Sequence, residues 1–326
     1  MEESRFPQSR RVESPVVAQP ALPVLVSREG PHAERRFVEF FTARIRNRGT
    51  RANYARAARD FLAWCEAGGL SLRTIGPVHV AAYVERLGQT HSAPTVKLRL
   101  AALRMLLDDL VVGQVIPTNP AASVQGPRHV VKKGSTPVLR ADEARQLLDA
   151  IDATTLVGLR DRAVIGVMVY SFARVSAAVG MNVEDYFPQG RRMWLRLHEK
   201  GGKRHDVPAH HNAEAYLDAY LEATGIRDER KGPLFRTVSP RRDLSLTRLH
   251  RTDVLRMIKR RARQAGLTTA VCCHTFRATG ITAYLENGGL LEHAQRIAAH
   301  ESVRTTKLYD RTSDAVSLDE IERIVI

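Results

Sequence analysis

Six side chains suited to phosphate chemistry stand out in the second half of the sequence. In chain order they are Arg174, Lys200, His274, Arg277, His300 and Tyr309. His274 and Arg277 are three residues apart, which puts both on one face of the first turn of a predicted helix. Taken singly, each has a structural interpretation, such as a helix cap, a solvated turn or a buried histidine. Their combination therefore carries the functional argument.

This combination suits displacement at a phosphate group. The planar fork of an arginine donates two parallel hydrogen bonds, so Arg174 and Arg277 can hold two non-bridging oxygens. A tyrosine phenol, with a pKa of about 10, needs a base or a strongly positive site before it attacks. A histidine can take that proton, and a lysine crowded by arginines has a lowered pKa and can act as a general acid. The sequence has no phosphate-binding glycine loop, dinucleotide-binding turn, His-Glu-x-x-His segment or nucleophile elbow.

The charge balance indicates a polyanionic partner. The 50 Lys and Arg outnumber the 35 Asp and Glu, which gives a net charge of +15. Nucleic acid fits better than a membrane surface, because no long basic amphipathic stretch carries an aromatic face. No apolar run reaches the roughly 18 residues of a spanning helix, and the first residues lack a signal-peptide core. We therefore expect a cytoplasmic, nucleoid-associated protein with no membrane partner.

The sequence gives no sign of a metal or cofactor. Three cysteines, Cys65, Cys272 and Cys273, cannot form a disulfide framework, which fits a reducing compartment. Four histidines lie around the predicted hairpin without acidic or cysteine partners at ligand spacing. They are His198, His205, His210 and His211. We therefore predict no metal site and no cofactor.

The patterning predicts a mainly α protein of two domains with a small β-hairpin. Residues 1–32 are rich in proline without sustained periodicity and read as a flexible tail. Residues 33–124 show four helical segments, residues 125–137 have linker composition, and residues 138–326 form the second domain. In that domain, Met193–Leu197 and Arg204–Val207 alternate as a hairpin should. Helices are expected at 141–151, 159–172, 213–223, 246–264, 277–286, 290–298 and 318–326.

The ordered set resembles the catalytic residues of the tyrosine recombinase family, the phage-integrase and Xer-like enzymes. The spacing between His300 and Tyr309 is the usual one of that family. The hairpin Glu199-Lys200-Gly201-Gly202-Lys203-Arg204-His205-Asp206-Val207-Pro208 matches the family pattern Gly-Lys-Gly-x-Lys-x-Arg-x-Val-Pro, which puts the catalytic lysine at Lys200. The N-terminal helices look like the family's SAM-like core-binding domain. The resemblance covers nearly the whole chain.

The resemblance implies a reaction and a role for each residue. Tyr309 would be the nucleophile and would form a 3′-phosphotyrosyl link, leaving a free 5′ hydroxyl. His274 would take the phenol proton, His300 would donate to the phosphate, and Lys200 would protonate the departing oxygen. Because the covalent intermediate preserves the phosphodiester energy, religation needs neither ATP nor metal. The alternatives are a type IB topoisomerase-like relaxing enzyme and a non-catalytic DNA-binding regulator.

The sequence departs from the family near its first arginine. The family commonly has Gly-Leu-Arg there, with Ser-Glu soon after, whereas this chain has Phe172-Ala173-Arg174 and then Val175-Ser176-Ala177. The missing glutamate removes a carboxylate that could orient Arg174. Glu184 and Asp185 are the acidic residues we consider as its substitutes.

Both domains are expected to hold duplex DNA, mainly through phosphate contacts. The candidate contacts are Arg51, Arg56, Lys97, Arg99, Arg104, Arg248, Arg256, Lys259, Arg260 and Arg263. At the C-terminus, Leu318, Ile321, Ile324 and Val325 form an apolar stripe, and in similar recombinases this segment docks on a neighbouring protomer. We expect a homo-oligomer, with a dimer on each recombination site and a tetramer in the synapse, in integration, excision or transposition.

Overall fold

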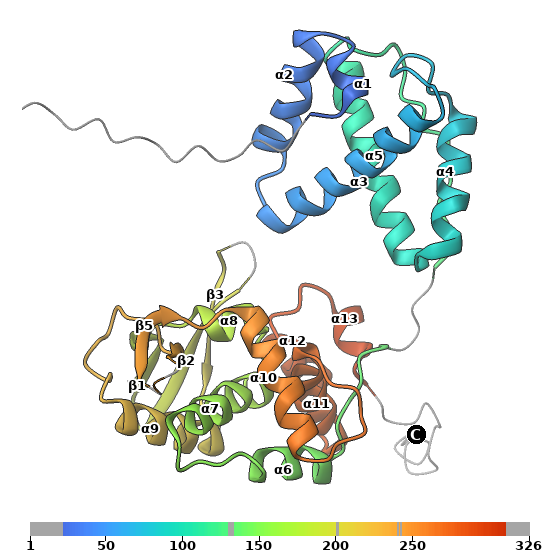
Figure 1. Ribbon diagram of the computed structural model, residues 1–326. Coiled ribbons are helices and arrows are strands. Elements are labelled where there is room, and N and C mark those ends of the chain that lie inside the picture. Colours follow the sequence, from blue (N-terminus) through green and yellow to red (C-terminus); the bar gives the residue numbers. More distant parts are fainter. Residues whose placement is uncertain (1–21, 130–133, 200–201, 240, 242, 311–326) are drawn as a thin grey trace, which may run out of the picture. The chain divides into compact units, whose positions relative to one another are not determined.

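The computed structural model describes residues 22–129, 134–199, 202–239, 241 and 243–310. The chain divides into two compact units, residues 1–130 and 131–326, and each is described by itself (Figure 1). The mainly helical fold with small antiparallel sheets is confirmed. In the described residues, no helix is long and apolar enough to cross a bilayer.

The N-terminal unit is a helical bundle. Its helices are α1 (Val24–Ser27), α2 (Pro31–Glu39), a π-helical turn (Phe40–Arg44), α3 (Arg48–Ala67), α4 (Pro77–Thr90) and α5 (Ala93–Val112). The apolar residues of these helices share one core, in which Phe61, Leu62 and Leu103 are each 1% exposed.

Part of the segment predicted as an N-terminal tail is folded. Helix α1 lies inside the range 1–32, and its Leu25 and Val26 are buried in the bundle core. The prediction of a flexible tail to residue 32 is therefore wrong for α1 and the start of α2. A helix of one turn is too short to show a 3.6-residue period, so its packing carries no local signal.

The second unit is built around a buried helix. Its helices are α6 (Ala141–Asp149), α7 (Leu156–Tyr170), α8 (Val175–Gly180), α9 (His211–Thr224), α10 (Arg251–Gln264), α11 (Cys273–Glu286), α12 (Leu291–Ile297) and α13 (Val303–Lys307). Helix α7 packs against both α9 and α11 (Figure 1). At Gly280 of α11 a Cβ would lie 2.1 Å from the carbonyl oxygen of Val169. Only glycine allows α11 to approach α7 this closely.

The predicted hairpin is confirmed and belongs to a larger sheet. Strands β1 (Tyr186–Gln189), β2 (Arg192–His198) and β3 (Arg204–Pro208) are antiparallel in that order. Leu195 pairs with Val207, and both point into the core. This pairing fixes the hairpin on the unit and carries Glu199 to the edge of the cavity described below.

A second strand pair corrects one predicted helix. Strands β4 (Arg236–Val238) and β5 (Leu244–Arg248) form a two-stranded sheet, so α10 begins at Arg251 rather than at residue 246. Leu244 to Arg248 alternate as Leu-Ser-Leu-Thr-Arg, which is a strand period. The predicted helix at 318–326 lies outside the described residues.

Candidate active site

Arg174 follows a strained turn at the end of α7. It occupies the N-cap of α8, two residues after Phe172, whose φ is +53°. In the described residues, positive φ outside glycine occurs at Gln114, Phe172 and Ala299. A bulky residue in this region of backbone space is uncommon and is held there by its surroundings. Phe172 stands where the family commonly has glycine, the residue that adopts a positive φ most freely.

Arg277 braces two such turns from within the core. Its residue is 1% exposed, and its Nη1 donates to the carbonyl oxygen of Phe172. Its Nη2 donates to the carbonyl oxygen of Ala298 at 2.5 Å. The next residue, Ala299, has a φ of +47°. Burial and the charge of Arg174 lower the pKa of Arg277 to about 10. Arg277 thereby fixes the backbone in front of both Arg174 and His300.

His274 lies one turn before Arg277 at the start of α11, as predicted. Partial desolvation, followed by the charges of Arg277 and Arg174, lowers the pKa of His274 below its usual value, although the residue stays accessible to solvent. The imidazole is therefore neutral at pH 7 and able to accept a proton.

His300 and Tyr309 lie face to face. Their ring centroids are 5.7 Å apart and the rings are tilted by 8°. Each residue is 8% exposed. Burial, then the charges of Arg277, Arg174 and His274, lowers the pKa of His300 to about 3. His300 is thus neutral across the ordinary pH range.

Two threonines fix this pair. His300 Nδ1 lies 2.9 Å from Thr306 Oγ1, and Thr306 is fully buried. The hydroxyl of Thr282 donates to the carbonyl oxygen of Tyr309 at 2.9 Å. If Thr306 donates its hydroxyl proton to Nδ1, the other ring nitrogen, Nε2, carries the remaining proton and can donate it to a bound group. Neither threonine was singled out from the sequence, because both contacts join residues whose proximity depends on the fold.

Beside these side chains is an open cavity of about 430 Å³. It is lined by Arg174, Glu199, Lys203, Ala299, His300, Glu301 and Thr305. The structure therefore brings Arg174 and His300 into one cavity. Arg277, His274 and Tyr309 are tied to them by the contacts and charge effects above.

The carboxylate beside Arg174 comes from an unexpected place. Arg174 Nη1 donates to Glu199 Oε2, an ion pair in which the Glu199 side chain is 5% exposed. The suggested substitutes are wrong, because Glu184 pairs with Lys231 at 2.9 Å and Asp185 contacts His198 at 3.0 Å. Glu199 stands at the first glycine of the family's hairpin pattern, a signal already present in the sequence.

The catalytic lysine of the resemblance, Lys200, lies outside the described residues. Its neighbour Lys203 donates to Glu301 Oε1 at 3.0 Å. Of the groups of three or more His, Cys, Asp and Glu in the described part of the chain, none could hold a metal ion.

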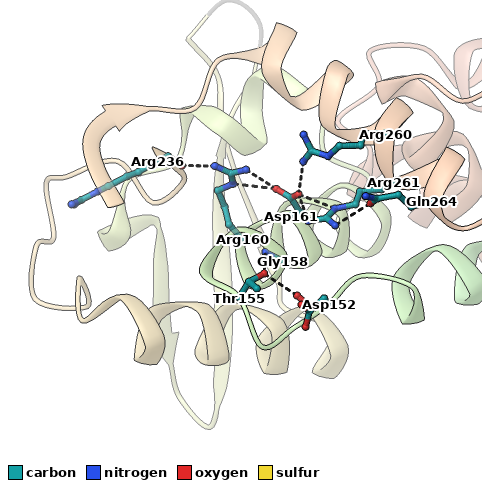
Figure 2. Close-up of polar contacts among 9 residues, drawn as sticks. All are labelled: Asp152, Thr155, Gly158, Arg160, Asp161, Arg236, Arg260, Arg261 and Gln264. Carbon is teal, nitrogen blue, oxygen red and sulfur yellow. Dashed lines mark hydrogen bonds and ion pairs between the residues drawn. The ribbon is translucent and has the colours of Figure 1, made fainter. Parts of the chain in front are cut away.

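Helix α10 presents basic residues to solvent and is anchored by one carboxylate. Arg256, Lys259 and Arg263 are exposed. Figure 2 shows Arg160, Arg260 and Arg261 converging on Asp161 of α7, which is fully buried. Its Oδ2 accepts from Arg261 at 2.8 Å and from Arg260 at 3.2 Å, and its Oδ1 accepts from Arg160 at 2.7 Å. Arg260 remains 49% exposed, so it can still reach a partner in solvent.

Arg248 is corrected as a DNA contact. It lies on β5, and its guanidinium donates to the carbonyl oxygens of Val179 and Met181 at 2.8 and 2.7 Å and to Asn182 Oδ1. Burial lowers its pKa. Through these hydrogen bonds, Arg248 holds β5 against the end of α8.

In the N-terminal unit the basic candidates fall into two groups. Arg56 and Lys97 are exposed. The other three bind within the unit: Arg51 donates twice to the carbonyl oxygen of Ile45, Arg99 pairs with Asp60 at 2.7 Å, and Arg104 donates to the carbonyl oxygens of Ala121 and Val124. These structural roles make Arg51, Arg99 and Arg104 the weaker candidates for DNA contact.

Comparison with known proteins identifies both units. The model of the phage integrase family matches residues 137–315, more than half of the chain, and that of the phage integrase N-terminal SAM-like domain matches residues 36–112. Tyrosine recombinase XerD of Corynebacterium glutamicum is 31% identical over 298 residues, covering 84% of this chain and 90% of the relative. Tyrosine recombinase XerC of Chlamydia muridarum is 29% identical over 233 residues, covering 71% and 70%.

Solved structures share the fold. A lambda integrase fragment, a dimer bound to a COC′ core site, superposes with a TM-score of 0.66 at 20% identity, covering 88% of this chain and 98% of that chain. XerH recombinase bound to difH DNA superposes with a TM-score of 0.62 at 19% identity, covering 84% and 78%. The family-model match and the relative over 30% identical establish the relationship. The chain belongs to the phage integrase family of tyrosine recombinases.

Proposed function

We propose that this chain breaks and rejoins DNA strands at specific sites by way of Tyr309. The observation that carries the proposal is that Arg174 and His300 line one cavity, while Tyr309 stacks on His300 and the charges of Arg277 and His274 act on the same histidine. A non-catalytic regulator would have no need of a tyrosine stacked on a neutral histidine beside two arginines.

The buried arginine offers a hydrogen-bond donor for a substrate oxygen. Arg277 Nε is buried and has no hydrogen-bond partner among the described residues. Leaving a buried charged donor unpaired costs about 1–3 kcal/mol or more, and a phosphate oxygen would satisfy it. Arg174, whose side chain is 33% exposed, lines the cavity. The two guanidiniums then neutralise the charge that develops on the non-bridging oxygens.

Proton transfer follows from the histidine pKa values. His274, neutral at pH 7, takes the phenol proton as the Tyr309 oxygen forms its bond to phosphorus. His300 donates through its second ring nitrogen to a non-bridging oxygen. The bond from phosphorus to the 5′ oxygen breaks, and Lys200, assigned by the resemblance alone, supplies the proton that this oxygen needs. Reversal by a different 5′ hydroxyl rejoins the strand.

We also propose that the chain assembles on DNA as dimers that pair into a tetramer. Lambda integrase, a structural neighbour, has been solved as a dimer on a core site and as a tetramer on a Holliday junction. The docking role of residues 318–326 concerns residues outside the described part of the chain. A variant ending at Ser317 should bind DNA singly but lose cooperative assembly in a gel-shift titration. We propose that the chain works where its DNA lies, in the cytoplasm at the nucleoid.

Covalent trapping tests the proposed reaction. A binding site is first selected from random duplex DNA by its retention on the chain, and a nick is then placed in it so that the cleaved strand cannot rejoin. The wild-type chain should give a denaturation-resistant adduct, which Tyr309→Phe should abolish while DNA affinity is retained. An equal adduct yield from Tyr309→Phe would place the nucleophile elsewhere. A supercoil-relaxation assay run beside it separates recombination from simple relaxation.

A further inference from the structure

In the described part of the chain, Arg174 has one carboxylate partner, and it comes from the hairpin rather than from helix α8. Glu199, directly after β2, reaches the guanidinium across 25 residues of sequence. Its backbone N–H donates to the carbonyl oxygen of Lys203 at 2.8 Å, so the hairpin itself fixes where the carboxylate points. Position 177, where the family has its glutamate, is a fully buried alanine.

The Glu199 carboxylate offsets the repulsion between two arginines in the site. Arg174 and Arg277 are close enough that the charge of Arg174 lowers the pKa of Arg277, whereas the charge of Glu199 raises it. Two guanidiniums this close repel each other, and a nearby carboxylate offsets that repulsion. The side chain of Glu199 is 5% exposed, so solvent screens this interaction little.

We propose that Glu199 is the positioning residue for Arg174, a role moved in this chain from α8 to the β2–β3 hairpin. This inference rests on the proposed function and concerns how the phosphate clamp is held. Glu199 engages Nη1, and among the described residues Arg174 has no other side-chain hydrogen bond. A guanidinium held at one edge presents its remaining N–H groups in a fixed direction, here toward the cavity of 430 Å³.

The two departures of this chain from the family pattern, at positions 177 and 199, are explained by one relocation of a carboxylate. The loss of a carboxylate at Ala177 and the gain of one at Glu199, where the hairpin pattern has glycine, leave the charge around Arg174 the same. A carboxylate that instead competed with the phosphate for Arg174 would slow the reaction, and its removal would speed cleavage. The two roles therefore predict opposite effects of one substitution.

The test measures single-turnover cleavage of the nicked site by the full chain, together with DNA affinity and thermal unfolding. Glu199→Gln keeps the shape and removes the charge, and we expect cleavage about tenfold slower. Glu199→Ala should slow it about 100-fold, since a misplaced catalytic group can cost about that factor. Glu199→Asp, which restores the charge, should recover most of the rate lost in Glu199→Ala. DNA affinity should stay within about twofold throughout.

Asp206→Asn is the matched control. It removes a carboxylate from the same hairpin and breaks the ion pair of Asp206 with Arg196, which has two hydrogen bonds of 3.1 Å. Neither residue of this pair lines the cavity. Its cleavage rate should equal that of the wild type. Cleavage by Glu199→Gln at or above the wild-type rate, or a loss explained by weaker DNA binding or unfolding, would overturn the positioning role alone. Absence of any adduct from the wild-type chain would overturn the proposed function, and the positioning role with it.

Discussion

Substituting Asp161 by asparagine should destabilise the second unit by about 3 kcal/mol. The carboxylate is fully buried and accepts from three guanidiniums, Arg160, Arg260 and Arg261 (Figure 2). Removing one partner of a buried ionic group costs about 3–5 kcal/mol, because it leaves uncompensated charge in the interior. The lower end applies here, since Arg260 is 49% exposed and can turn to water, whereas Arg160 and Arg261 are 9% and 11% exposed.

The assay uses the chain's two tryptophans, Trp64 in the bundle and Trp194 on β2. In a Trp64→Phe background, the fluorescence of Trp194 reports the second unit alone, which avoids treating a two-unit chain as a single transition. With a urea slope of about 2 kcal/mol/M, a loss of 3 kcal/mol lowers the midpoint by about 1.5 M.

Two further variants separate charge from packing at this cluster. Asp253→Asn breaks an exposed pair with Arg256 on the same helix, so the midpoint should hardly move. Adding Arg261→Gln to Asp161→Asn removes one unpaired buried guanidinium, and about 1 kcal/mol should return. A midpoint shift in Asp161→Asn no larger than that of Asp253→Asn would refute the reasoning that this carboxylate anchors α10.

Two more predictions concern the turn and the histidine before Tyr309. Ala299→Val should lower stability by about 1–3 kcal/mol, because a β-branched residue fits poorly at φ +47°, whereas Ala299→Gly should leave the urea midpoint nearly unchanged. If the Val variant is as stable as the wild type, the backbone at position 299 is not strained. His300 should make the chain acid-sensitive. Its folded pKa of about 3 lies below the ordinary 6.5, so the unfolded state takes up the proton first and stability is lost as the pH falls below 6.5. Between pH 6.5 and 5 this amounts to at most about 2 kcal/mol, and His300→Gln should flatten that part of the profile.

Patterns within one segment were predicted well from the sequence. The alternation of Met193–Leu197 located a strand, and the spacing of His274 and Arg277 placed both in the first turn of α11. These features depend on the period of a single element, which burial of one face imposes on the sequence. The same reasoning failed for α10, where the leucines of β5 precede the helix without a break and invite its extension to residue 246.

Partnerships across the fold were not predictable in the same way. Arg51, Arg104 and Arg248 looked like basic surface residues, yet each donates to backbone carbonyl oxygens within its own unit. In the sequence, an arginine whose guanidinium binds a phosphate looks the same as one that binds a peptide carbonyl. The ion pair of Arg174 with Glu199 is of this kind too: Glu199 departs visibly from the hairpin pattern, but nothing local to it indicates that Arg174 is its partner.

One buried side chain, that of Arg277, aligns the proposed catalytic residues. Arg277 donates hydrogen bonds to the carbonyl oxygens of Phe172 and Ala298. Phe172 lies two residues before Arg174, and Ala298 lies two residues before His300. Because both turns are left-handed, their backbone would relax if this brace were lost, and Arg174 and His300 would move together. The nine-residue step from His300 to Tyr309 then allows the short helix α13 to fold the tyrosine back onto the same histidine. Arg277 is therefore both a candidate phosphate ligand and the group that aligns the others, so its substitution cannot report on phosphate binding alone, whereas substitution of Glu199 acts on Arg174 without touching either turn.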